Sequence, residues 1–169
     1  MKPIYGHGVF FVSLDGVFIQ NIFFEYVDVR KEFYETIRVD SLREEEVSNI
    51  KERMQAFLDE EIVKINGKVV KPKVMAVDVG FRTSPKRPYI NFIIVFKGDF
   101  IKGLNVYENI YEPEVSEYDY TVLWIFHSGI QVVDADFGMP YERLGNNVML
   151  LKVKKGVKTS GYERISFFV

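Results

Sequence analysis

Most of this sequence consists of short runs that favour β-strands, separated by turn residues. Phenylalanine and tyrosine account for 15 and 10 of the 169 residues, and valine and isoleucine are frequent beside them. Aromatic and β-branched side chains pack well on a pleated, half-buried surface, so these runs predict strands. The expected strands are residues 4–12, 16–29, 33–39, 61–65, 69–81, 89–97, 103–111, 118–127, 130–137, 148–153 and 161–168.

One segment, residues 42–59, has the spacing of an amphipathic helix. Ser41 and Glu44 form the pattern of a capping box at its start. A single helix among many strands predicts a mainly β fold (all-β to α+β), an antiparallel β-sandwich with the helix across one end or edge. The apolar stripe of the helix consists of Val47, Ile50, Met54, Phe57 and Leu58.

Two segments predict a particular strand arrangement, a tight hairpin and a buried central strand. Asn66-Gly67 lies between alternating apolar residues, which is the strongest short signal for a β-hairpin. Tyr89–Phe96 is apolar at both alternating sets of positions, and this pattern predicts a central strand buried on both faces.

The composition indicates one globular domain, residues 1–169, without a flexible linker. The absence of cysteine excludes disulfides and thiolate metal sites, and two histidines are too few for a site of three. No apolar run reaches the roughly 18 residues of a membrane span. The first residues lack the order of a signal peptide, so we expect a cytoplasmic protein. Abundant lysine and glutamate with only three glutamines favour a thermophilic source.

Charge is distributed in blocks along the chain. The net charge is −2, which makes a nucleic-acid binder driven by overall charge unexpected, but residues 62–98 hold eight basic residues and one acidic residue. This block is either a solvated face, opposed by acidic blocks, or an anion-binding patch. The candidate binding residues are Lys64, Lys68, Lys71, Lys73, Lys86 and Arg87.

A second candidate site follows from reading residues 118–137 as a hairpin with Ser128-Gly129 as its turn. In that register residue 121 pairs with 136, and Asp119, Asp134 and Asp136 meet at the hairpin base. Clustered carboxylates repel one another unless solvent, basic residues or a hard cation offsets their charge. The cluster is therefore either a solvated acidic face or a metal site, with a divalent cation as the one cofactor to expect. His127 falls at the hairpin tip, too far from the cluster to share a ligand, and is expected to be a turn residue.

No nucleophile elbow or phosphate-binding glycine loop is present, and no motif identifies a family. The absence of these motifs favours a non-enzymatic binding or interaction module that acts through a sheet face or edge. We expect this module to self-associate, most simply as a homodimer. Its partner would be a second copy, another protein or a small molecule, not a membrane. Asn105, Tyr107, Asn109 and Tyr111 share one strand face, which is either a recognition surface or a half-covered sheet face. The alternatives are a metal-binding domain or metal-dependent hydrolase at the aspartates, and an anion or nucleic-acid binder at the basic block.

Overall fold

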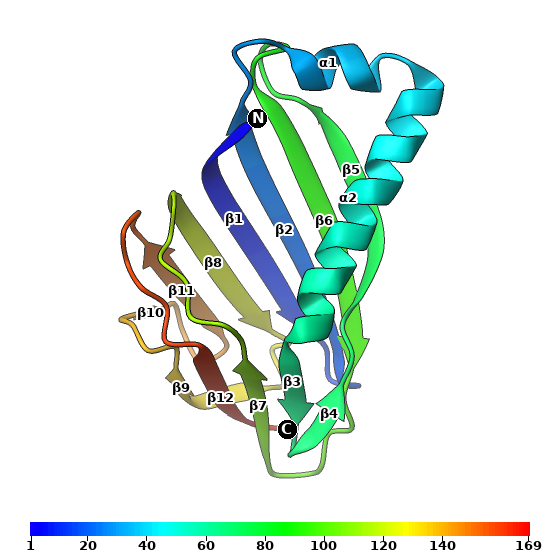
Figure 1. The fold of residues 1–169 in the computed structure, drawn as a ribbon. Helices are drawn as coiled ribbons and strands as arrows, with labels where there is room; N and C mark the ends of the chain where they lie inside the picture. Colours follow the sequence, from blue (N-terminus) through cyan, green and yellow to red (C-terminus); the bar gives the residue numbers. More distant parts are fainter.

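The computed structural model describes residues 1–169, which form two packed β-sheets and two helices (Figure 1). The large sheet has seven strands in the order β10-β11-β8-β1-β2-β6-β5, and the small sheet has five in the order β4-β3-β7-β12-β9. The elements are β1 (Lys2–Val12), β2 (Val17–Val27), α1 (Glu32–Ile37), α2 (Asp40–Glu60), β3 (Ile62–Ile65), β4 (Lys68–Val70), β5 (Lys73–Phe81), β6 (Pro88–Lys97), β7 (Leu104–Ile110), β8 (Asp119–Phe126), β9 (Gln131–Asp136), β10 (Glu142–Arg143), β11 (Val148–Val153) and β12 (Tyr162–Phe168).

The predicted mainly β sandwich is confirmed, with one departure from an antiparallel arrangement. Strand β8 lies beside β1 in parallel, with Gly6 opposite Tyr120 and Phe10 opposite Trp124. A parallel neighbour needs a long crossover connection. Here the chain passes through the helices, β5, β6 and the small sheet before it returns to β1.

Two hydrophobic cores lie on the same face of the large sheet, which we call the inner face. The first fills the space between the sheets, and the second lies beneath α1 and α2 on β5 and β6. Figure 1 shows α2 and the small sheet on the same side of the large sheet. The first core includes Phe18, Tyr107, Trp124, Phe126, Ile165 and Phe167, and the second includes Phe33, Ile50, Leu58, Ile90 and Ile94.

The helix expected at 42–59 is confirmed as α2, but its start differs. The residue before the helix is Val39, which is extended and makes no side-chain capping bond, so the capping box of Ser41 and Glu44 does not form. The strand expected at 33–39 is wrong, because these residues belong largely to α1. The buried carboxylate of Asp28 accepts the backbone N–H of Phe33 at 2.9 Å, and this bond satisfies a free donor in the first turn.

The Asn66-Gly67 hairpin is confirmed. Both residues have positive φ, 51° and 77°, and Ile65 pairs with Lys68 across the turn. The 118–137 hairpin is wrong, since β8 lies in the large sheet and β9 at the edge of the small sheet. Trp124 and Val132 are buried in the same core from opposite sheets. Burying both segments against each other across the sandwich removes more apolar surface from water than pairing them in one sheet.

Asn105 is completely buried and joins three parts of the small sheet. Its Oδ1 accepts the Asn66 side-chain amide and the Ile101 backbone N–H, both at 2.8 Å. Its Nδ2 donates to the carbonyls of Ile101 and Gly103. Every polar atom of the side chain is therefore satisfied, and each bond holds the 98–104 loop or the β3–β4 turn against β7.

We expect Asn105→Ala to lower the free energy of unfolding by about 2 to 4 kcal/mol, because it removes four hydrogen bonds and leaves buried partners unsatisfied. The measurement is urea unfolding, with exposed Asn146→Ala as the matched control. Equal stability of the two variants would contradict this role for Asn105.

Candidate functional site

Apolar residues are frequent on the side of the large sheet that faces away from the small sheet, which we call its outer face. Strand β6 was expected to be buried on both faces, and this prediction is wrong. Its burial alternates: Ile90, Phe92, Ile94 and Phe96 are buried on the inner face, whereas the residues between them remain part-exposed. Ile93 and Val95, the aliphatic residues of the second set, are therefore only partly covered within the chain.

The strand register arranges these outer residues in two rows. One row crosses five adjacent strands without a polar residue, and the other crosses six strands with Asn21 as its only polar member. We call the two rows together the outer apolar face. Phe11 and Ile19, at the centre of the first row, are 46% and 41% exposed. The first row is Val148, Ile125, Phe11, Ile19 and Val95, and the second is Leu150, Leu123, Val9, Asn21, Ile93 and Ala76.

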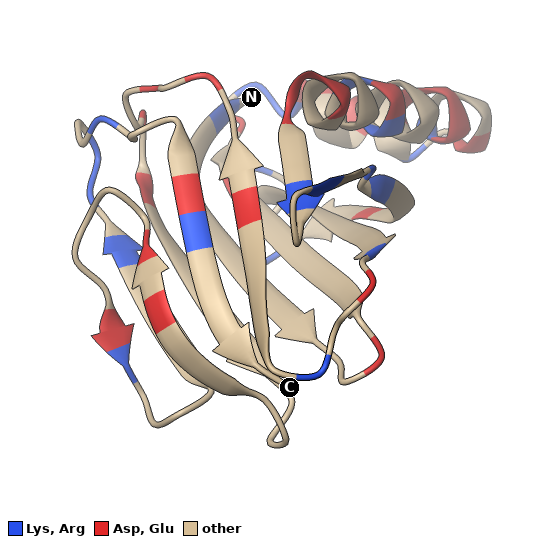
Figure 2. Ribbon diagram, turned by 90° about the horizontal axis from the view of Figure 1, so that it is seen from below, with Lys and Arg blue, Asp and Glu red and all other residues tan.

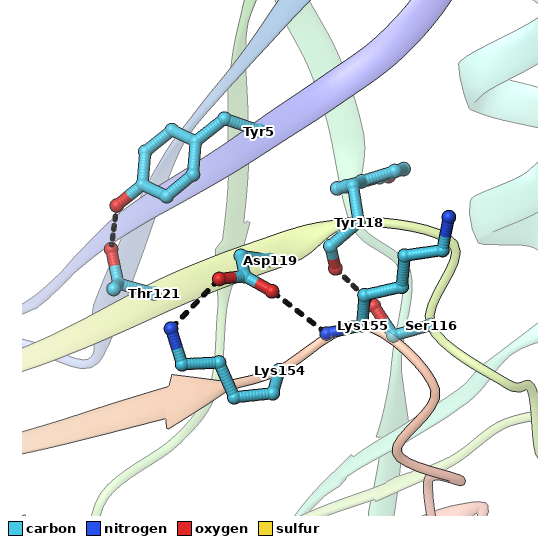
Figure 3. A network of polar contacts seen from close by, with 7 residues as sticks. All are labelled: Tyr5, Ser116, Tyr118, Asp119, Thr121, Lys154 and Lys155. Carbon is cyan, nitrogen blue, oxygen red and sulfur yellow. Dashed lines mark hydrogen bonds and ion pairs between the residues drawn. The ribbon is translucent and has the colours of Figure 1, made fainter.

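Polar side chains border this face at the end where β8 begins. The Thr121 hydroxyl lies 2.6 Å from Nδ1 of His7 and 3.0 Å from the Tyr5 hydroxyl. Beyond it, Asp119 accepts from Nζ of Lys154 at 2.8 Å and from the Lys155 backbone N–H at 2.9 Å (Figure 3). These bonds lower the pKa of Asp119.

The sheet edges are less suited to association than the face. The outermost strands β10 and β4 have two and three residues, and β5 and β9 contact their neighbours through irregular registers. Short strands and bulges at edges hinder pairing with another chain. The edges are therefore poorly suited to pairing with another chain.

The inner face carries a cavity of about 720 Å³ where neither core fills the sheet. It lies between Phe57 of α2 and the segment that joins β7 to β8, and β1, β2 and β8 form its floor. Gly6 and Gly8 contribute no side chain there, so the rings of Tyr118 and Phe10 approach the positions that a Cβ would occupy. The sequence analysis did not identify this cavity, because its residues come from segments far apart in the chain.

Two glutamates form hydrogen bonds with the small sheet, Glu163 of β12 and Glu61, which lies between α2 and β3. Glu163 accepts the Tyr107 hydroxyl at 2.9 Å, and Glu61 accepts the Asn109 side-chain amide at 2.9 Å. Burial raises the pKa of Glu61. Burial and the charge of Glu61 raise the pKa of Glu163 to about 7, against the opposing effect of the Tyr107 hydroxyl.

The structure does not bring together the three aspartates of the predicted metal site. Asp119 borders the large sheet and pairs with Lys154, whereas Asp134 and Asp136 are exposed on β9 of the small sheet. Their expected proximity depended on the 118–137 hairpin, which does not form. No group of three or more histidine, aspartate or glutamate side chains is arranged to hold a metal ion. His127 is an exposed turn residue, as predicted, and its Nδ1 accepts the Gly129 N–H at 3.0 Å.

The six residues of the basic block are divided between the two ends of β5 and β6. Lys64, Lys68, Lys71 and Lys73 lie around the β3–β4 hairpin and the start of β5, whereas Lys86 and Arg87 lie in the loop that precedes β6. The nine residues of β5 separate these ends by roughly 25 to 30 Å. Lys68 and Arg87 also form ion pairs, with Asp99 and Glu25. Figure 2 shows acidic residues among the basic ones and largely uncharged strands.

The row of Asn105, Tyr107 and Asn109 is not a recognition surface. These side chains are 0%, 1% and 8% exposed and belong to the inner side of the small sheet. Hydrogen bonds with Asn66, Glu163 and Glu61 satisfy most of their polar groups. Tyr111, the fourth residue of the predicted row, follows β7, is part-exposed and lines the cavity described above.

Comparison with known proteins gives no family. No protein-family model matches the sequence, and no curated protein matches it. Among solved structures, the folded domain of LppM from Mycobacterium tuberculosis is similar with a TM-score of 0.46 and 10% identity, covering 98% of this chain and 91% of that one. A putative protease from Parabacteroides distasonis is similar with a TM-score of 0.38 and 6% identity, and the match covers 99% of this chain and 40% of that one. Neither helix of this protein has the length and apolarity needed to cross a membrane.

The raised pKa of Glu163 gives a prediction with a definite sign. The folded protein keeps a proton on Glu163 up to about pH 7, whereas the unfolded chain releases it near the ordinary value of 4.5. The free energy of unfolding should therefore fall as the pH rises from 5 to 8. For Glu163→Gln this fall should be smaller by roughly 2 to 3 kcal/mol.

The measurement is urea unfolding at pH 5 and pH 8 for wild type, Glu163→Gln and the exposed control Glu60→Gln. If Glu60→Gln and Glu163→Gln changed the pH dependence equally, the proposed burial of a protonated Glu163 would be wrong.

Proposed function

We propose that this protein is a non-catalytic interaction module that self-associates as a homodimer through the outer apolar face. The observation that carries the proposal is the uninterrupted apolar row across five strands of a sheet face that no other part of the chain covers. Contiguous apolar patches of this kind mark interaction sites on soluble proteins. Charged residues occur at the margins of the face, and their depletion at the centre is typical of an interface core.

The outer side of the large sheet is large enough for a dimer interface. Six strands about 4.8 Å apart and about eight residues at roughly 3.3 Å per residue give this whole side roughly 750 Å² per copy, and the outer apolar face is its central part. A standard stable interface buries about 800 Å² on each partner. Both partners in a twofold dimer present the same patch, so one self-complementary sheet face is sufficient.

The surroundings of the face also favour a flat, apolar partner such as a second sheet. At the margin, Arg87 pairs with Glu25 and Lys154 pairs with Asp119, so these charges are compensated within the chain. At the same end, the guanidinium of Arg82 covers the ring of Phe23 at 4.7 Å. The region around Phe11 and Ile19 lacks such a cover, and packing two sheets face to face would bury it from both copies.

We expect the wild-type protein to elute as a dimer of twice 19.8 kDa, and Ile19→Lys to be monomeric at the same concentration. A lysine at the centre of the interface would lose its hydration without a partner, and this should weaken association at least about a hundredfold. The measurement is light scattering coupled to size-exclusion chromatography, over a dilution series.

Leu104→Lys is the matched control, since Leu104 is 46% exposed on the small sheet and distant from the outer apolar face. It should remain dimeric. A monomeric wild type at millimolar concentration, or equal effects of the two lysines, would refute self-association through this face.

A further inference from the structure

The cavity on the inner face has a composition that selects a class of ligand. Its apolar and aromatic residues are interspersed with His7, Ser116, Thr121 and Thr159. The lining also includes three glutamates but neither lysine nor arginine. The three glutamates, Glu112, Glu114 and Glu117, are exposed at the margin, and none of them takes part in an ion pair. A fatty acid or a phosphate would meet uncompensated negative charge there.

The charge of these glutamates acts on the aromatic side of the cavity. Phe24 and Tyr118 form an edge-to-face pair with ring centres 6.2 Å apart, and Tyr120 lies beside them in the lining. Burial raises the pKa of Tyr118, and the charges of Glu114 and Glu117 raise it further. The carboxylates therefore impose a negative potential on the tyrosine rings, whose faces are themselves electron-rich.

The acidic segment is held in place before any ligand arrives. The Glu114 N–H donates to the Thr159 hydroxyl at 2.8 Å, and the Ser116 N–H donates to the Val157 carbonyl at 2.9 Å. The Ser116 hydroxyl in turn donates to the Tyr118 carbonyl (Figure 3). A segment whose backbone is already ordered loses little backbone freedom on binding.

We propose that this cavity binds a small organic cation with an apolar body, such as an alkylammonium compound. The cationic group lies over the rings of Tyr118 and Tyr120, close to Glu114 and Glu117, and the apolar body packs on the floor beside Gly6 and Gly8. Cations bind to aromatic faces by electrostatic attraction, and most strongly where water is partly excluded. The volume of about 720 Å³ is within the range of small-molecule sites.

The apolar and aromatic lining of this site lies on the opposite face of the large sheet from the proposed dimer interface, although His7 and Thr121, which border the outer apolar face, also line it. Phe57 and Phe11 are matched positions at which binding in the cavity and dimerisation can be tested separately. They are 48% and 46% exposed, and Phe57 lines the cavity whereas Phe11 belongs to the outer apolar face. Phe57→Ala should affect the cavity alone, and Phe11→Ala the dimer alone.

The test uses octyltrimethylammonium and octanoate, which share an alkyl chain but carry opposite charges, in titration calorimetry below their micelle concentrations. We expect one cation per chain and at least tenfold weaker binding of octanoate. Glu114→Gln combined with Glu117→Gln should remove this preference. Phe57→Ala should weaken binding of the cation at least threefold, and Phe11→Ala should leave it unchanged.

Three results would overturn the proposal. They are equal affinity for the two probes, a cation preference that survives in the double glutamine variant, and absence of binding by either probe. Thermal unfolding of each variant without probe shows whether it is folded, and the lone variants Glu114→Gln and Glu117→Gln provide the test if the double variant is not. A monomeric wild type that still binds the cation would refute the proposed dimer and leave the cavity site standing.

Discussion

The architecture depends on the packing of two different layers against one face of a single sheet. The small sheet and α2 both lie on the inner face of the large sheet, and each has its own core there. Burial of apolar surface is the main favourable term in folding, so this double packing supplies most of the stability of the chain. It also has two consequences for function. The outer face keeps its apolar residues without a covering layer, and the seam between the two layers leaves room for the cavity.

The two candidate surfaces differ in the kind of partner that their chemistry fits. The outer apolar face is broad and poor in charge, which suits another sheet. The cavity is narrow, aromatic and acidic at its margin, which suits a small cation. Strands β1 and β8 contribute to both surfaces, because their alternate residues point to opposite faces. Phe11 and Ile125 lie in the outer rows, whereas Gly8 and Val122 line the cavity.

The predicted metal site and the predicted anion-binding patch both depended on residues being close in space, and the fold separates these residues. Asp119 was grouped with Asp134 because residues 118–137 have the pattern of a hairpin, with Ser128-Gly129 at its turn. The turn exists, but it connects two sheets, since Trp124 and Val132 are buried from opposite sides of one core. Likewise, the tight spacing of basic residues in the sequence becomes a wide separation once β5 extends between them. Local patterns describe neighbours along the chain, and strand pairing is decided by long-range burial.

The sequence by itself determined the features that depend on local physics. These are the mainly β composition, most of the strand positions, the helix over most of α2 and the Asn66-Gly67 turn, because backbone propensity and positive φ are properties of short segments. Only the tertiary structure decided which strands share a sheet, which face of β6 is covered, and that Glu163 and Tyr107 meet in the interior. The identity of an apolar residue does not show which element will pack on it. The sequence therefore predicted that β6 is buried on both faces. The fold covers one side of this strand and leaves the other part-exposed.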